Sequence, residues 1–408
     1  MLTTLLSAIQ GAFSSFTRGF LIVALVPMVL FIAANAALLS AVNRTWYSTL
    51  KLGAFSDVSS FLWLVGAAAA ALVLGALQPF LYRLTEGQNM PSFLRWYWHG
   101  VQRFRLDCMR DQAEAATKFN DDLGSNLQHW MDDLDLPANN VGGSVPDEAA
   151  RKLVDKLKTR RRYDRNLTIE EITGAVNALH VHLTAGGAAP TPDALRAARR
   201  DLLRVINFAR DRAIYERTRI HNQLQASFPG EVFDPDASSD NVLAPTGFGN
   251  IGRTVRSYAL RRYGMDLDIF WTRFQKVMMD STGKMSDNLT GQKSQVDFLV
   301  NMLWLAVLTG TVWTPVLWIE AGHPLLFAAV ALATPVLAWL FYDAACRAYL
   351  VFADQMRTAV DTFRFDVLTG LHIAAPIGTK DEEALWERLG NRIGYARKDA
   401  TFLYVRKP

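Results

Sequence analysis

Cysteine and recognisable catalytic motifs are scarce in this sequence. Its 408 residues include two cysteines, Cys108 and Cys346, which are too few for a disulfide framework. The chain has no Cys-x-x-Cys pair, no His-Glu-x-x-His metal motif and no glycine-rich phosphate-binding loop. Without a catalytic constellation, we predict that the protein is not an enzyme and that it has no catalytic residue, no metal and no cofactor.

Charge is missing from four hydrophobic stretches, which are residues 19–42, 61–82, 298–319 and 325–342. A hydrocarbon core about 30 Å thick needs about 20 apolar helical residues to cross it, and a helix satisfies its own backbone groups in lipid. The predicted fold class is therefore an all-α membrane protein with four transmembrane helices, arranged as two hairpins with a large helical cytosolic domain inserted between them. The expected boundaries are 1–18 for an amphipathic N-terminal helix, 19–82 for the first hairpin, 83–297 for the cytosolic domain, 298–342 for the second hairpin and 343–408 for cytosolic C-terminal helices.

The arginine and lysine residues near the span ends predict the orientation. Five arginines follow the second stretch between residues 83 and 110, and three follow the fourth. The loop between the first two stretches has two basic residues, and the loop between the last two has none. We expect a multi-pass protein of the bacterial inner membrane with both termini in the cytoplasm. The formal net charge of +4 is too small to indicate a nucleic-acid partner by itself.

Outside the spans, apolar periodicity and capping residues predict further helices. They are expected at 93–134, 147–162, 168–183, 191–225, 253–276 and 382–393, and the fourth span should continue as one helix to residue 371.

The first residues form an uncharged amphipathic helix, in which Leu5, Ile9 and Phe13 share one face. One interpretation is a helix in the membrane interface that leads into the first span. The other is a plug that folds back into an opening between subunits.

Polar residues within the spans allow two interpretations. Asn35, Gln78, Asn301, Thr309 and Thr311 lie at or near membrane depth, where they can form hydrogen bonds between helices or line a hydrated pore in an oligomer. The spans lack a carboxylate, lysine or arginine at mid-membrane depth, which argues against a proton-coupled transporter or pump.

Arginines gather in two places of the region between the spans. On the long predicted helix they lie opposite an apolar stripe, and a second group precedes that helix. This face is either solvated or a site for an anion or oligonucleotide, because arginine forks fit phosphate. The candidate ligand-binding residues are Arg196, Arg199, Arg200, Arg210, Arg160, Arg161 and Arg162.

Several short motifs resemble an uncharacterised family of bacterial four-span membrane proteins. They are Ala-Pro-Thr-Gly-Phe-Gly-Asn at 244–250, Tyr258, Arg-Tyr-Gly-Met-Asp at 262–266, Trp271, Tyr-Arg-Leu-Thr-Glu-Gly at 82–87, Phe-Arg-Phe-Asp at 363–366 and Leu-Trp at 385–386. The family pattern has Trp-Pro where this chain has Trp271-Thr272. None of these motifs implies a reaction.

The architecture is also similar to the channel-forming membrane effectors of Hailong-type anti-phage defence. That resemblance implies a channel held closed by DNA oligomers that a partner nucleotidyltransferase makes. Together these observations favour a homo-oligomeric pore or ion channel gated by its cytosolic helical domain, with a short single-stranded nucleic acid as ligand and a role in cell death during phage defence. The alternative is a membrane-anchored scaffold that binds a cytosolic partner and conducts nothing.

Overall fold

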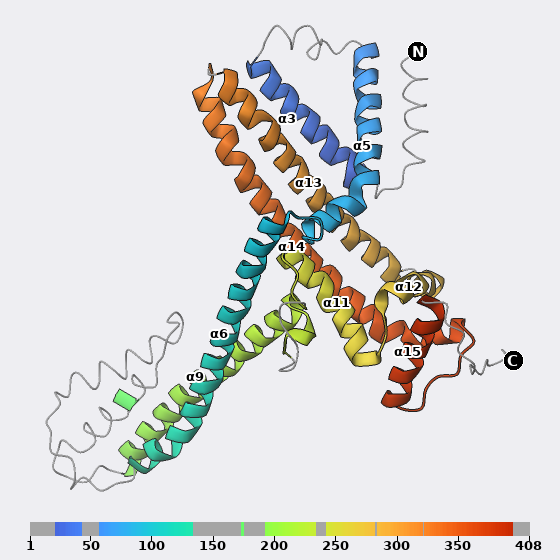
Figure 1. The fold of residues 1–408 in the computed structure, drawn as a ribbon. Coiled ribbons are helices and arrows are strands. Elements are labelled where there is room, and N and C mark those ends of the chain that lie inside the picture. Colours follow the sequence, from blue (N-terminus) through green and yellow to red (C-terminus); the bar gives the residue numbers. More distant parts are fainter. Residues whose placement is uncertain are drawn as a thin grey trace. The chain divides into compact units, whose positions relative to one another are not determined.

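The computed structural model describes residues 21–42, 57–133, 173–174, 192–233, 242–281, 284–320 and 322–394. Within these ranges the regular elements are helices, which confirms the all-α prediction (Figure 1). The nine α-helices of this described part are α3 (Val26–Val42), α5 (Asp57–Thr85), α6 (Ser92–Asp133), α9 (Pro192–Ser227), α11 (Gly247–Tyr263), α12 (Leu267–Ser281), α13 (Lys284–Glu320), α14 (Pro324–Gly370) and α15 (Thr379–Gly394). A π-helical turn, η1 (Leu21–Leu25), precedes α3, and a 3-10 turn, η4 (Gly230–Phe233), follows α9.

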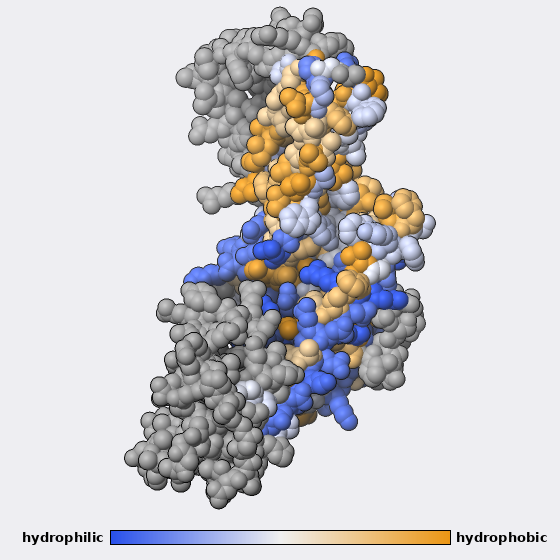
Figure 2. Space-filling view, turned by 90° about the vertical axis from the view of Figure 1, so that its left-hand side faces the viewer, coloured by the Kyte–Doolittle hydropathy of each residue, from blue (hydrophilic) through white to orange (hydrophobic). Residues whose placement is uncertain are grey.

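Four of these helices are long and apolar enough to cross a membrane. They comprise Ile22–Val42, Val65–Thr85, α13 and α14. The first two overlap most of the expected stretches 19–42 and 61–82, and α13 and α14 contain 298–319 and 325–342. Figure 2 shows their apolar surface in orange. The protein therefore has the features of a multi-pass membrane protein.

Helix α13 is the centre of the packing between the spans, since it contacts η1, α3, α5 and α14. Small residues bring the helices close together. Ala24 and Ala71 are buried in one cluster with Leu74, Val300 and Ala345. At Gly310 the backbone of α13 runs against α14, where a Cβ atom would lie 2.5 Å from the hydroxyl of Thr334.

The chain divides into two compact units, one formed by Met1–Arg103 with Gln225–Pro408 and the other by Phe104–Leu224. In the first unit, α11 and α12 pack against the second half of α14, and α15 packs on α11 and α12, around a core that includes Phe270, Phe274 and Trp386. In the second unit, buried apolar side chains mark one side of each long helix, at Leu106, Met109 and Leu123 on α6 and at Ala213, Ile220 and Leu224 on α9.

Most of the long helices agree with the sequence prediction. Helix α14 runs without interruption through 47 residues, as expected for a span that continues beyond the membrane. The predicted helices at 147–162 and 168–183 lie outside the described residues, apart from two helical residues at 173–174.

The single helix predicted at 253–276 is wrong, because the chain breaks into α11 and α12 at Gly264. This glycine has φ 67°, in the left-handed region that ends many helices. Its N–H donates to the Leu260 carbonyl at 2.8 Å, and the N–H of Met265 donates to the Ala259 carbonyl at 3.2 Å. Asp266 then starts α12, with its carboxylate accepting from the N–H of Asp268 at 3.0 Å. The residues on both sides of Gly264 have helical composition, so the sequence did not predict this break.

Substituting Gly264 with alanine should destabilise the protein. The left-handed conformation costs an L-residue about 1–2 kcal/mol, and the new Cβ would lie 2.7 Å from the Glu383 carbonyl oxygen. Thermal unfolding in detergent should show a clear loss of stability. Gly291→Ala is the matched control, since a Cβ there meets nothing within 4 Å and alanine favours a helix by about 1 kcal/mol. Equal stability of the two variants would contradict the proposed role of Gly264.

Candidate functional site

The candidate site is a network of polar side chains that joins the first three spans. It begins with Pro27 in the first span. Proline has no N–H, so the carbonyl four residues earlier, that of Val23, loses its helical donor. The amide nitrogen of Asn301, on α13, donates to this carbonyl at 2.7 Å, and Asn301 is 0% exposed. Asn301 thus satisfies a backbone group that would be costly to leave unpaired in lipid.

Gln78 joins the second span to the same asparagine. The Asn301 amide nitrogen also donates to the Gln78 side-chain oxygen at 3.2 Å, and the Gln78 amide nitrogen donates to the Asp297 carbonyl at 3.4 Å. The side-chain oxygen of Asn301 is buried and has no hydrogen-bond partner. This oxygen is therefore a buried acceptor without a donor.

A paired carboxylate lies one helical turn before Asn301. Asp297 is 7% exposed and accepts from the Tyr82 hydroxyl at 2.6 Å. Its second oxygen lies 2.8 Å from the Lys293 ammonium. This ion pair was not predicted from the sequence. The available signal was Lys-x-x-x-Asp at the start of an apolar stretch, since residues four apart share a helix face.

A second polar contact lies elsewhere in the bundle. The Trp313 indole donates to the Asn35 side-chain oxygen at 2.6 Å, and the Asn35 amide nitrogen donates to the Phe31 carbonyl at 2.7 Å. The hydroxyls of Thr309 and Thr311 donate to carbonyls of their own helix. Of the five candidate pore residues, Asn35, Gln78 and Asn301 thus connect different spans within one chain. That any of the five lines a pore stays a prediction.

Hydrogen bonds join the end of the second span to α11. The Thr246 hydroxyl donates to the Thr85 carbonyl at 2.8 Å and accepts from the N–H of Gly249 at 3.0 Å, which caps α11. The Thr85 hydroxyl accepts from the Trp304 indole at 2.9 Å. At Gly249 a Cβ would lie 2.5 Å from the Glu86 carbonyl oxygen, so glycine permits this close approach.

Other residues of the 244–250 motif also hold the start of α11 against the end of the second span. Asn250 is fully buried and pairs with both backbone groups of Ala244, accepting at 2.6 Å and donating at 3.2 Å. Phe248 packs between Tyr82 and Tyr349, with ring centroids 5.6 Å and 4.4 Å away. Two motifs far apart in the sequence, 82–87 and 244–250, therefore meet in the fold and have a structural role.

Polar contacts also fix α11 and α15 on α14. The hydroxyls of Tyr258 and Tyr263 donate to the Asp361 carboxylate at 2.8 Å and 2.7 Å. Burial, together with this carboxylate, raises the pKa of Tyr258 above its ordinary value, so its hydroxyl keeps its proton. The Arg364 guanidinium lies 2.9 Å from Glu382 of α15.

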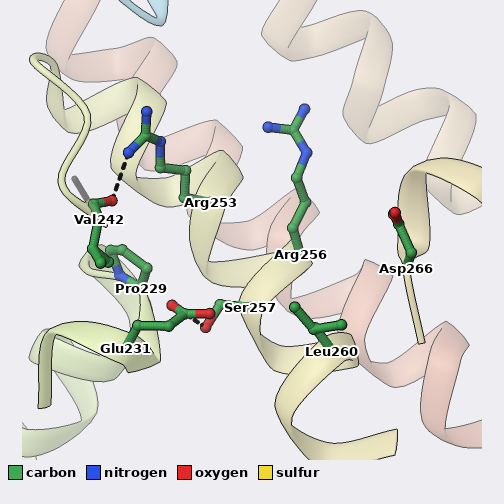
Figure 3. A pocket seen from close by; sticks show the side chains of 8 residues that line it. All are labelled: Pro229, Glu231, Val242, Arg253, Arg256, Ser257, Leu260 and Asp266. Atoms are coloured by element: carbon green, nitrogen blue, oxygen red, sulfur yellow. Dashed lines mark hydrogen bonds between the residues drawn. The ribbon is translucent and has the colours of Figure 1, made fainter. Parts of the chain in front are cut away.

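A pocket of about 300 Å³ opens beside α11 (Figure 3). Its charged groups are already engaged. Arg253 donates to the Val242 carbonyl at 2.6 Å, Arg256 pairs with Asp268 at 3.1 Å, and the Ser257 hydroxyl donates to Glu231 at 2.6 Å. The full lining is Pro229, Glu231, Val242, Arg253, Arg256, Ser257, Leu260 and Asp266. Because Arg253 and Arg256 are balanced by Glu231 and Asp266, the pocket does not favour the binding of an anion.

Most of the candidate ligand-binding and plug residues fall outside what the structure describes. Arg210 is exposed on α9. The α9 backbone includes Arg196, Arg199 and Arg200, whose side chains are not described. The candidate residues Arg160, Arg161, Arg162, Leu5, Ile9 and Phe13 lie outside the described ranges.

No protein-family model, curated protein or solved structure matches this chain.

Replacing Asn301 with leucine should weaken the bundle. The substitution leaves the Val23 carbonyl and the Gln78 side-chain oxygen without this donor, and an unsatisfied buried polar group costs about 1–3 kcal/mol. The measurement is thermal unfolding in detergent. Thr311→Val is the control, because Thr311 is exposed and its hydroxyl bonds within its own helix; its effect should stay within about 0.5 kcal/mol. If both variants melt like the parent, Asn301 does not hold the spans together.

Proposed function

We propose that this chain forms a homo-oligomeric pore or ion channel of the bacterial inner membrane, gated by the helical region outside the membrane. In this proposal the spans form two hairpins, and both termini are cytoplasmic. The four apolar helices support the membrane location, and the exposed Arg83 at the end of the second span supports the orientation.

The packing of the spans favours a pathway between copies over one within a copy. Apolar side chains fill the centre of the bundle around Ala71, Val300 and Ala345. The polar side chains described there, Asn301 and Gln78, bind one another and the backbone carbonyls of Val23 and Asp297. A hydrated path would therefore need surfaces contributed by several copies. The exposed hydroxyl-bearing side of α13 at Thr311 is one such surface.

The observation that carries the gating proposal is the continuity of α14. One helix contains the fourth span and also the residues that hold α11 and α15, namely Asp361 and Arg364. The Arg357 guanidinium adds a bond to the Thr254 hydroxyl at 2.6 Å. Movement of the packed helices outside the membrane would thus be transmitted to the span through covalent backbone.

Ion flux into liposomes that contain the purified protein tests this proposal. Asp361→Asn removes the charge that Tyr258 and Tyr263 bind, so it should change the flux several-fold by loosening α11 from α14. Thr358→Ala is the control on the same helix, since Thr358 is exposed and bonds its own helix at the Asp354 carbonyl. A monomer in native mass measurements, or no flux from any variant, would exclude the channel and favour the non-conducting scaffold.

For the gating ligand we propose a short single-stranded oligonucleotide bound to the arginine face of α9. The arginines of this 36-residue helix, including the exposed Arg210, support it. The resemblance to Hailong-type effectors adds a partner nucleotidyltransferase as the source of such a ligand and cell death in phage defence as its outcome.

Charge reversal on α9 tests the ligand. Arg199→Glu with Arg200→Glu should weaken binding of short single-stranded DNA or RNA at least tenfold, and binding to the parent should fall steeply with salt as counterions are released. Fluorescence anisotropy at several salt concentrations measures both effects. Glu114→Gln, an exposed charge change on α6, should leave binding unchanged. If the parent shows no salt-sensitive binding, the arginine face is only solvated.

A further inference from the structure

The first turns of α6 expose large apolar side chains in an unbroken group. Within residues 93–98, Phe93 is 69% exposed, Trp96 81% and Tyr97 58%, and Leu94 and Trp98 are also exposed. Arg95 is the one charged residue of this segment, and it is exposed as well. Contiguous exposed apolar groups usually mark an interaction surface rather than ordinary protein exterior.

The orientation of this segment is fixed by the next turn of the helix. The His99 ring lies 3.2 Å from the Leu243 carbonyl, and the buried Gln102 side chain accepts from Asn250 at 3.4 Å. At 3.6 residues per turn, Phe93 and Tyr97 lie on the side of α6 away from Gln102. The side chains of Phe93 and Tyr97 therefore point away from the unit that holds the helix.

The segment also lies close to the end of a membrane span. Helix α5 ends at Thr85 and α6 begins at Ser92, so the chain between them can reach about 25 Å at most. The turn is compact, because the N–H of Gln88 donates to the Arg83 carbonyl at 2.8 Å. Gly87 has φ 83°, and its Cα packs so tightly on Pro245 that a Cβ would lie 2.5 Å from that ring. The aromatic segment is thus held near the level where the span leaves the hydrocarbon core.

We infer that residues 93–98 lie in the interfacial layer of the bilayer, with the aromatic rings among the lipid glycerol and upper acyl groups and Arg95 on the headgroup phosphates. Tryptophan and tyrosine favour this layer, where one end of the ring is apolar and the other is wet. The exposed Arg83 adds a second cation at the same span end, which favours acidic headgroups. Continuity with the span argues for lipid as the occupant. A symmetric contact with a second copy would bring the two Arg95 charges together.

A depth measurement by spin labelling tests this inference, whether or not the protein conducts ions. The protein with Cys108→Ser and Cys346→Ser receives one cysteine at a time, by Trp96→Cys, Leu332→Cys or Glu387→Cys. Leu332 is 70% exposed within the fourth span, and Glu387 is exposed on α15. Each variant is labelled with a nitroxide in liposomes of phosphatidylcholine and phosphatidylglycerol. Collision rates with oxygen, which concentrates in the bilayer, and with a water-soluble nickel chelate are then compared.

The label at Trp96→Cys should show an oxygen-to-nickel collision ratio between those of the two controls, and several-fold above that of Glu387→Cys. A ratio equal to that of Glu387→Cys would place the segment in water and overturn the inference. Low collision with both reagents, together with dipolar broadening, would show a second copy on this surface and would overturn it equally. Phe93→Cys repeats the test if Trp96→Cys fails to reproduce the melting of the parent.

Discussion

Pro27 has no N–H to donate to the carbonyl four residues before it, that of Val23, and a backbone carbonyl left without a donor is costly in a membrane. The structure meets this requirement with the side chain of Asn301, from a helix 278 residues further along the chain. Because the amide has two N–H groups, Asn301 also binds Gln78 and so joins a third helix. One missing backbone hydrogen thus fixes the relative register of three spans.

The same helix, α13, carries the other polar contacts between spans. Asp297 and Trp304 reach the second span through Tyr82 and Thr85, and Trp313 reaches the first through Asn35. These groups are spaced along one helix, so each contact helps to orient the next. The centre of the bundle is therefore specified by directional bonds as well as by the close packing of small residues.

The sequence predicted what depends on local properties. Length and hydropathy located the four spans, and unbroken helical composition predicted the extension of α14. It did not predict the break at Gly264, because apolar periodicity continues on both sides and only a left-handed glycine ends the helix. Nor did it identify Asp297 as a contact of Tyr82, which is 215 residues away. Such pairing depends on which helix faces meet, and local hydropathy and periodicity do not show that. Asn35, Gln78 and Asn301 were found correctly as polar groups in the spans, but their partners were not.

The length of α14 has a mechanical consequence. At 1.5 Å per residue, its 47 residues extend about 70 Å, roughly twice the thickness of a hydrocarbon core. A rigid rod of that length that tilts by about 10° displaces one end relative to the other by about 12 Å. A modest reorientation of the span within the membrane therefore becomes a displacement of about one helix diameter at the far end, where Tyr258, Tyr263 and Glu382 bind.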